Sequence, residues 1–271
     1  GFIGSYGIAT LFQGNLLDLE VRDIYDPDGQ LDLKIIPPKP LQGIADKWGA
    51  RDANWFFDFP TSAQKVTGLL ESSKIYQEQG MKFAGAVAIN VEIIKDLLEI
   101  VGPVELSEYK LTIDKDNFLK EVQREVETGS DKAKTCPKKI LKVLTPIIFD
   151  RIAGLDQKNA LIEKMAARLG KKDVMIYFKD KAIEEYLKKL EVAGEVAVLP
   201  EDFSGEYLAV VNANIAGGKS DAFMSQKVKL ESRVDKLGQV KNHLTVERSH
   251  HGQNEKDWWY RATNRNYLEV L

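Results

Sequence analysis

At the start of the chain, short runs of strand-forming residues alternate with turn-forming residues. Two such runs, residues 2–12 and 16–25, flank Gln13-Gly14-Asn15 and predict a β-hairpin. Two turn-forming segments follow, Asp26-Pro27-Asp28-Gly29 and Pro37-Pro38-Lys39-Pro40, and they predict a surface loop without a regular element.

A helix and an apolar strand are expected next. Thr61 or Ser62 can cap a helix that runs to about residue 79, and Gly80 ends it. Seven successive apolar residues at 83–89 cannot alternate toward water, so they predict a central strand covered on both faces.

The following segment places another helix between strands. Asn90 is expected to cap a helix over residues 91–101, which Gly102-Pro103 ends. A strand over residues 104–113 would complete a strand-helix-strand unit, whose connection is right-handed if its strands are parallel.

The rest of the chain is helical in its middle and rich in strands at its end. The helical patterns cover residues 117–127, 137–152, 157–169 and 181–192. The strand patterns cover residues 174–178, 207–211, 223–233, 240–248 and 258–271. Together these elements predict one α/β domain over residues 1–271. We expect a three-layer αβα sandwich with a mixed sheet and an antiparallel C-terminal part.

Composition narrows the class of protein. The 271 residues are 44% hydrophobic and 29% charged, which is typical of a globular protein. The net charge of −3 argues against a broad nucleic-acid interface, which needs clustered Lys and Arg. The single cysteine, Cys136, excludes an internal disulfide framework.

The two ends of the sequence suggest a piece of a longer protein. The chain begins without Met inside a strand-like run and stops inside another apolar run. No stretch approaches the roughly 20 apolar residues that span a bilayer. We therefore expect any anchor to lie outside this fragment.

The strongest candidate site is the segment from Arg51 to Pro60. Arg51, Asp52, Asn54, Trp55 and Asp58 fall in a loop before a helix, where backbone amides can also face an anion or a sugar. The alternative is a loop fixed by a pair between Arg51 and a carboxylate, with its aromatic side chains in the core.

A second polar segment follows an expected strand. Gly217-Gly218-Lys219-Ser220 lacks the first glycine of a phosphate-binding loop, because Ala213 stands there. Asn214, Lys219 and Ser220 still gather at a strand end, where α/β proteins bind ligands. A glycine-rich turn explains them equally well.

The histidines offer a weaker signal. His243, His250 and His251 are the only ones, so a zinc site would need carboxylates from distant positions. Arg248-Ser249-His250-His251-Gly252 is typical of a solvated turn.

Several segments, taken together, resemble a bacterial family of unknown function, the domain family numbered 4012. The similarity lies in Gly1-Phe2-Ile3-Gly4-Ser5-Tyr6-Gly7, Arg51-Asp52-Ala53-Asn54-Trp55, Asp58-Phe59-Pro60, Gly85-Ala86-Val87-Ala88-Ile89, Leu97-Leu98, Gly102-Pro103-Val104-Glu105, Asn212-Ala213-Asn214 and Gly217-Gly218-Lys219-Ser220. The resemblance implies an N-terminal membrane segment outside this fragment and a domain outside the cell.

Residues 83–106 also resemble the strand-helix-strand core of the LytR-CpsA-Psr proteins. Those proteins transfer glycopolymers from a polyprenyl-phosphate carrier to the cell wall, and they bind the lipid pyrophosphate in an Arg- and Asp-lined pocket, often with Mg²⁺. Arg51-Asp52 is similar to their Arg-Asp pair as a dipeptide only, because the surrounding residues differ.

These resemblances lead to a functional hypothesis. An extracytoplasmic, membrane-anchored cell-envelope domain would bind a phosphate-linked glycopolymer or its polyprenyl-phosphate carrier, and could transfer it as a glycopolymer phosphotransferase. Arg51 and Lys219 would neutralise phosphate, and Trp55 would stack on sugar or prenyl chain. Asp52 or Asp58 would act as base, and Asp52 could hold Mg²⁺. Asn54, Asn214 and Ser220 complete the predicted ligand-binding set.

The competing hypothesis is a non-catalytic surface module that binds envelope polymer or a protein partner through the same loop. Glycoside hydrolysis is a third possibility, but it needs two facing carboxylates that a sequence cannot place.

Overall fold

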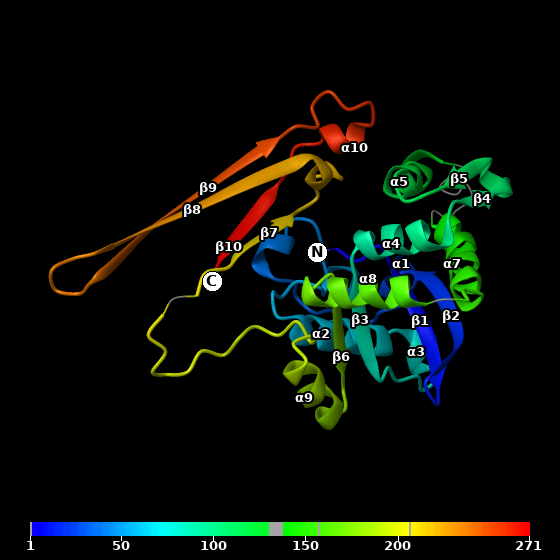
Figure 1. The fold of residues 1–271 in the computed structure, drawn as a ribbon, viewed down its shortest axis with the longest axis horizontal. Coiled ribbons are helices and arrows are strands. Elements are labelled where there is room, and N and C mark those ends of the chain that lie inside the picture. The colour runs from blue at the N-terminus through cyan, green and yellow to red at the C-terminus, as the bar shows by residue number, and fades with distance from the viewer. Residues whose placement is uncertain (1, 130–137, 157, 206) are drawn as a thin grey trace. The chain divides into compact units, whose positions relative to one another are not determined.

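The computed structural model describes residues 2–129, 138–156, 158–205 and 207–271 (Figure 1). These residues divide into two compact units. The larger unit comprises Phe2–Ile35 and Trp48–Leu199, and the smaller unit comprises Ile36–Lys47 and Pro200–Leu271. The prediction of a single domain stays a prediction.

The larger unit begins with the expected hairpin. Strands β1 (Ser5–Phe12) and β2 (Asn15–Asp23) pair antiparallel. Gln13 and Gly14 form the turn with φ of 49° and 79°, a backbone that matches the twist of a tight hairpin. The loop predicted after this hairpin is partly regular, because α1 (Tyr25–Gly29) makes one short helical turn.

The helix before the apolar run starts earlier than the sequence suggests. Helix α2 (Phe59–Glu71) is capped by Asp58, whose side chain accepts a hydrogen bond from the Thr61 amide. A short α3 (Lys74–Gln77) follows, and Gly80 ends the segment with φ of 62°. The predicted caps Thr61 and Ser62 are therefore wrong, since Asp58 provides the stronger acceptor.

Strand β3 (Gly85–Ile89) is not a central strand. It pairs antiparallel with β6 (Val174–Phe178) alone among the described residues, and Val87 and Ile89 remain 59% and 55% exposed. An apolar run fits a covered strand, but the run itself does not specify a second neighbour. This part of the prediction is corrected.

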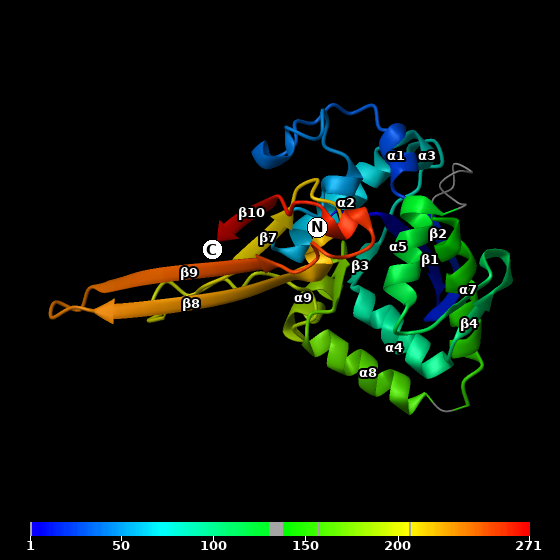
Figure 2. The same cartoon turned by 90° about the horizontal axis from the view of Figure 1, so that it is seen from above.

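The helices of the larger unit enclose its main apolar core. Asn90 caps α4 (Val91–Val101), as expected, and α4 packs against α7 (Lys139–Ala153) and α8 (Asn159–Gly170) (Figures 1 and 2). The expected starts of α7 and α8, Pro137 and Gln157, lie outside the described residues. The other elements of this unit are β4 (Val104–Leu106), β5 (Leu111–Ile113), α5 (Phe118–Thr128) and α9 (Lys181–Lys189).

The core at these helices joins residues that are far apart in sequence. Ile113, Ile140 and Leu144 are at most 1% exposed and belong to one cluster with Leu98 and Val104. The expected strand over 104–113 is a small β4–β5 hairpin instead, interrupted by Ser107–Tyr109. Because β3 and β4 lie in different sheets, the predicted strand-helix-strand unit does not form.

The smaller unit holds the antiparallel ending that the sequence predicts. Strands β8 (Met224–Val234) and β9 (Val240–His250) pair along 11 residues each, roughly 36 Å of ribbon. Strand β7 (Val210–Asn214) pairs antiparallel with β10 (Asn266–Val270). Between β9 and β10 a short α10 (Trp258–Arg261) replaces part of the long final strand expected there.

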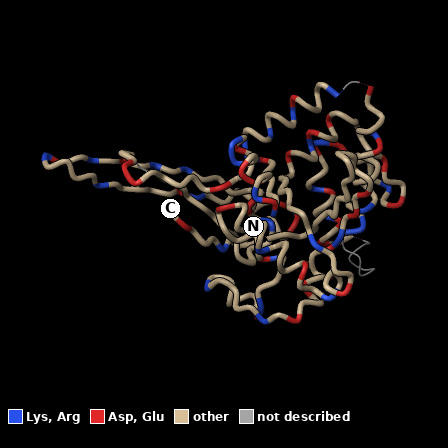
Figure 3. Tube along the Cα trace, turned by 90° about the horizontal axis from the view of Figure 1, so that it is seen from below, with Lys and Arg blue, Asp and Glu red and all other residues tan. Residues whose placement is uncertain are grey.

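The architecture as a whole is mixed α and β. The described residues form five two-stranded antiparallel sheets rather than one mixed sheet, so the three-layer sandwich is not confirmed. Positive and negative side chains are interspersed along both units (Figure 3). No helix in the described part of the chain has the length and apolar composition to span a bilayer.

Candidate functional site

Arg51 and Asp52 form a two-point ion pair in a single 3₁₀ turn, η2 (Ala50–Asp52), of the larger unit. Arg51 Nε donates to Asp52 Oδ1 at 3.0 Å, and Nη2 donates to Oδ2 at 2.9 Å. The Asp52 side chain is only 1% exposed, whereas that of Arg51 is 29% exposed. Hydrogen bonding to Asp52 raises the pKa of Arg51. The pair therefore buries a carboxylate whose charge is matched in place.

The backbone of this turn is held by Asp28. Its carboxylate accepts hydrogen bonds from the amides of Ala50 at 2.6 Å and Arg51 at 3.1 Å. Burial raises the pKa of Asp28, although these two bonds oppose the shift. A Cβ at Gly49 would lie 2.4 Å from Asp28 Oδ2, so a side chain there would displace the Asp28 carboxylate from these amides. Asp28 was expected in a turn, and it instead braces the predicted site.

An exposed aromatic ring lies beside this ion pair. The Arg51 guanidinium carbon is 5.3 Å from the ring centroid of Tyr25, and Lys138 Nζ is 5.0 Å from it. Tyr25 is 55% exposed, while Lys138 is paired with Asp23 at 2.8 Å. Tyr25 therefore presents part of its surface next to two fixed cations.

The aromatic residues of the predicted loop divide between core and surface. Trp55 is half-buried and packs against the cluster that contains Trp48 and Tyr76, and Asn54 is half-buried beside it. Phe56 and Phe57 are 39% and 45% exposed. The loop thus shows both features considered from the sequence, an ion pair that fixes it and aromatic rings that remain exposed.

Asp58 is committed to capping α2. Its Oδ2 accepts from the Thr61 amide at 2.9 Å and from the Thr61 hydroxyl at 2.5 Å, and its Oδ1 accepts from the Val196 amide at 3.0 Å. Burial opposes ionisation of Asp58, but these bonds outweigh it and hold its pKa below the ordinary value. Asp52 is therefore the carboxylate paired with Arg51, whereas Asp58 caps α2.

These contacts limit what the two carboxylates can do chemically. A base or a metal ligand needs a free lone pair directed at the reacting group. Each Asp52 oxygen accepts one hydrogen bond from Arg51, and the side chain is only 1% exposed, so a Mg²⁺ ion could reach Asp52 only if this buried pair opened. Asp52 in this position does not fit such an ion. Among the described residues, no group of three or more His, Cys, Asp or Glu is arranged to hold a metal.

The other predicted residues lie in the smaller unit, around Asn214. Asn214 Nδ2 donates to Gly217 O at 3.2 Å, Ser220 Oγ at 3.3 Å and Asp221 Oδ2 at 2.9 Å. The Ser220 side chain is fully buried and donates to Gly217 O at 2.8 Å. A Cβ at Gly217 would lie 2.0 Å from Asn214 Oδ1. The glycine-rich segment is therefore a packed turn, with Lys219 exposed at its surface.

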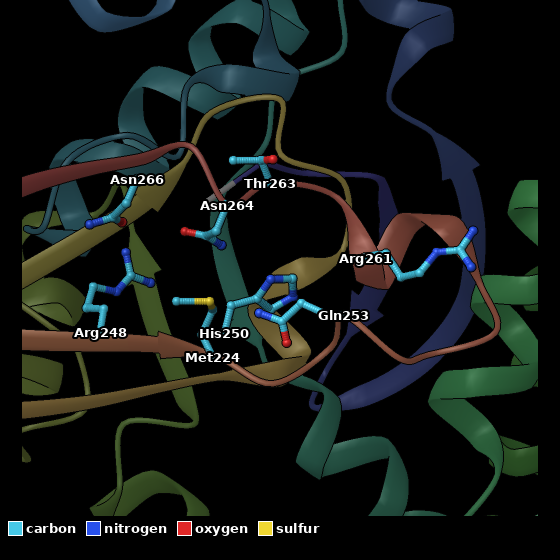
Figure 4. A pocket seen from close by; sticks show the side chains of 8 residues that line it. All are labelled: Met224, Arg248, His250, Gln253, Arg261, Thr263, Asn264 and Asn266. Carbon is cyan, nitrogen blue, oxygen red and sulfur yellow. The ribbon is translucent and has the colours of Figure 1, made fainter.

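A cavity of about 480 Å³ opens next to this turn, within the smaller unit (Figure 4). Its lining includes Met224, Arg248, His250, Gln253, Asn264 and Asn266. Arg261 also borders it, but its guanidinium points away from the other labelled side chains (Figure 4).

Two polar groups in this cavity lack partners among the described residues. They are Nε and Nη1 of Arg248 and Oδ1 of Asn264, all buried from solvent. His250 is fixed at the same place, since its Nε2 donates to Tyr260 O at 2.8 Å. Buried donors and acceptors without partners are costly unless a ligand matches them.

Sequence reasoning missed this cavity because it assigned Arg248 and His250 to a solvated turn. The available signal was alternation: Leu244, Val246, Arg248 and His250 are spaced by two residues, which places them on one face of a strand. Asn264 follows the β8–β9 ribbon in sequence, and the residues around it do not indicate that it lines the cavity.

The comparisons with known proteins add one finding. The model of the family described as "Protein of unknown function (DUF4012)" matches residues 1–126 of the chain. The match includes the Arg51 loop and strand β3 but not the Asn214 cluster or the cavity. No curated protein and no solved structure matches the chain. The resemblance to the LytR-CpsA-Psr proteins stays a prediction.

Proposed function

We propose that this chain is an extracytoplasmic cell-envelope module that binds a phosphate-linked glycopolymer or its polyprenyl-phosphate carrier, and that its role is binding rather than transfer. The envelope location and the membrane anchor outside the fragment rest on the family resemblance. The choice of binding over transfer rests on the geometry of the Arg51 loop.

The observation that carries the proposal is the use of the two predicted carboxylates. Both oxygens of Asp52 accept hydrogen bonds from Arg51. The oxygens of Asp58 accept hydrogen bonds from Thr61, at the start of α2, and from the Val196 amide. A transfer reaction needs a free base or metal ligand, whereas binding does not. Arg51 keeps part of its guanidinium exposed beside Tyr25, so a fixed cation and an aromatic surface remain for a ligand.

The ligand class follows from these two groups. An exposed guanidinium donates hydrogen bonds to phosphate, and exposed aromatic rings such as Tyr25 and Phe57 stack on sugar faces. A phosphate-linked glycan presents both partners. Lys219 could extend such a surface only if it lies near Arg51, and this arrangement stays a prediction.

Calorimetry tests the proposal with a phosphate-linked glycan fragment and a short-chain prenyl pyrophosphate, each with and without Mg²⁺. We expect binding that Mg²⁺ does not change, and a loss of roughly tenfold to a hundredfold in Arg51→Ala. Lys65→Ala is the matched control, because Lys65 is likewise a cation over an aromatic ring, Trp48, but lies outside the Arg51–Tyr25 surface. Mg²⁺-dependent formation of a transferred product would contradict a binding role.

A further inference from the structure

The β8–β9 ribbon of the smaller unit has an apolar face. In its register Val228 lies opposite Val246, and Leu230 lies opposite Leu244, so these side chains point to the same side. The apolar face is made by Val228, Leu230, Leu244 and Val246 and, beyond the polar pair Ser232–Asn242, by Val234 and Val240. Val228, Leu230, Val240 and Val234 are 42%, 43%, 52% and 66% exposed. These side chains are available for a contact that would remove them from water.

The opposite face of the ribbon is charged. It carries Lys227, Lys229, Glu231, Arg233, Lys241 and Glu247, and Figure 3 shows the charges along the ribbon. The apolar side chains are therefore sorted to one side. Because a two-stranded ribbon alone is only marginally stable, such sorting favours an apolar occupant on that side.

The apolar face leads directly into the cavity. Arg248 follows Val246 by two residues, and it lies opposite Gln226 in the same register. Arg248, Met224 and His250 therefore project from the ribbon on the apolar side, toward Asn264 (Figure 4). The face thus ends at a guanidinium that has two buried nitrogen atoms without partners among the described residues.

Arg248 and Asn264, the polar groups at the cavity end of the apolar face, favour a particular ligand chemistry. The residues described along the cavity include no Asp or Glu, so the charge of Arg248 is not matched there. Asn264 Nδ2 is already engaged by Asp221 at 2.8 Å, which leaves Asn264 Oδ1 as an acceptor. A matching head group has negative charge for Arg248 and an O–H donor for Asn264.

We propose that the cavity and the apolar face form one site for an amphiphilic phosphate. The phosphate head accepts hydrogen bonds from Arg248, and its P–OH or a neighbouring sugar hydroxyl donates to Asn264 Oδ1. The apolar chain lies along Val246, Val228 and Leu244. The site deepens the proposed function, on which it rests for its natural ligand, the carrier lipid.

Two other occupants fit less well. A second copy of the chain packed through the same ribbon face would cover the apolar side chains but would bring no negative charge to Arg248, because that face carries no Asp or Glu. A bilayer would place the unpaired backbone groups of both ribbon edges in hydrocarbon. Only the amphiphilic phosphate satisfies both the face and the cation.

The test uses the whole chain and linear alkyl phosphates of increasing length, below their micelle concentrations. Inorganic phosphate and alcohols of the same lengths serve as comparisons. We expect affinity to rise roughly twofold for each half-buried methylene group, and both comparison ligands to bind much more weakly. Arg248→Ala should weaken alkyl phosphate binding by roughly tenfold to a hundredfold.

Variants separate the chain contact from the head contact. Val228→Thr combined with Val246→Thr should flatten the dependence on chain length and leave the weak binding of short phosphates unchanged. Arg233→Ala, on the charged face of the same ribbon, is the matched control and should bind as the wild type does. Thermal melts check that every variant is folded.

Several outcomes would overturn the inference. Equal binding by Arg248→Ala, equal binding of alcohols, or chain-length independence in the wild type would each do so. Concentration-dependent dimers that Val228→Thr removes, without alkyl phosphate binding, would assign the face to a second copy. If prenyl pyrophosphate binding depends on Arg51 and not on Arg248, this site fails while the proposed function stands; the opposite result would retain this site and reject the Arg51 surface.

Discussion

The Asp52 carboxylate lies in the interior of the larger unit, and Arg51 alone among the described side chains compensates its charge. Both of its oxygens are bonded to Arg51, and its side chain is 1% exposed. A buried ion pair adds little over an apolar pair of equal size, but loss of one partner leaves the other charge uncompensated. Asp52 therefore contributes to stability mainly because it compensates the charge of the partly buried Arg51.

Asp52→Ala should lower the free energy of unfolding by about 2–3 kcal/mol, less than a fully buried pair, because Arg51 can still reach water. This corresponds to a fall in Tm of roughly 5–10 °C. Urea and thermal denaturation would measure it. Glu20→Gln is the control, since Glu20 and Arg22 form an exposed pair at 2.6 Å whose loss should cost less than about 0.5 kcal/mol. A similar loss in both variants would show that the pair of Asp52 with Arg51 does not fix the loop.

At the scale of elements, α4 and α8 are joined by a charged network. Asp96 on α4 accepts from Arg168 Nε at 2.6 Å and Nη2 at 3.1 Å, and from Lys164 at 3.3 Å. Arg168 also donates to Asp173 at 2.9 Å, just before β6. Hydrogen bonding to Arg168 lowers the pKa of Asp96. This network links two helices and a strand of the main core.

The network makes stability depend on pH in the acid range. Because the pKa of Asp96 is lower in the folded state than in the unfolded state, its contribution is complete above about pH 5 and is lost as pH falls through and below about 4. Asp96→Asn should therefore cost about 1–2 kcal/mol at pH 7, and the difference from wild type should shrink by pH 3. Urea denaturation across pH 3–7 measures this. A difference that is constant with pH would show that Asp96 does not carry the effect.

The β1–β2 turn offers a second test at this scale. Gly14 has φ of 79°, which costs an L-residue with a side chain about 1 kcal/mol, so Gly14→Ala should destabilise the protein by about that amount. Gln13 has φ of 49°, and Gln13→Asn should stabilise slightly, because Asn tolerates this backbone. Gly29→Ala is the control, since an added Cβ there has no atom within 4 Å. Chemical denaturation of the three variants decides the order.

At the scale of the molecule, the chain passes from the larger unit to the C-terminal part of the smaller unit between Leu199 and Pro200. Residues 195–200 carry no helix or strand, and Val198 and Leu199 are 94% and 40% exposed. Exposed segments without regular structure are the sites that proteases cut first.

Limited proteolysis should therefore cut first near Val198, Leu199 or Phe203, which is 47% exposed. Mass spectrometry would identify a fragment ending there, and circular dichroism should find it folded, because its main core lies within residues 2–199. Phe59 and Phe118 are each 6% exposed and provide internal controls. Early cleavage after either of them would contradict this division of the chain.

Local pattern predicted most elements but few of their neighbours. Strand 174–178, the helix capped by Asn90 and the long C-terminal ribbon form as expected, because their signals lie within the segment itself. The pairing of β3 with β6, about 90 residues apart, depends on tertiary contacts that an apolar run cannot encode. For this reason the sequence predicted a central strand here, whereas β3 has β6 as its single strand neighbour among the described residues.

The candidate site was predicted in the same uneven way. A pair between Arg51 and a carboxylate was one of two interpretations of this loop, and the structure identifies the carboxylate as Asp52. The bracing of this loop by Asp28 was not, because 22 residues separate Asp28 from Ala50. Likewise, Arg248 and Asn264 line one cavity because the fold brings β9 close to the residues that follow α10.

The pairing of β7 with β10 also bears on the order in which the chain is built. Among the described residues, Val210–Asn214 pairs with Asn266–Val270 alone, roughly fifty residues later. At about 5–20 residues per second, a ribosome would release β7 some 3–10 s before β10 exists. The smaller unit therefore cannot pair β7 until β10 has been synthesised, by which time the core residues of the larger unit are already complete.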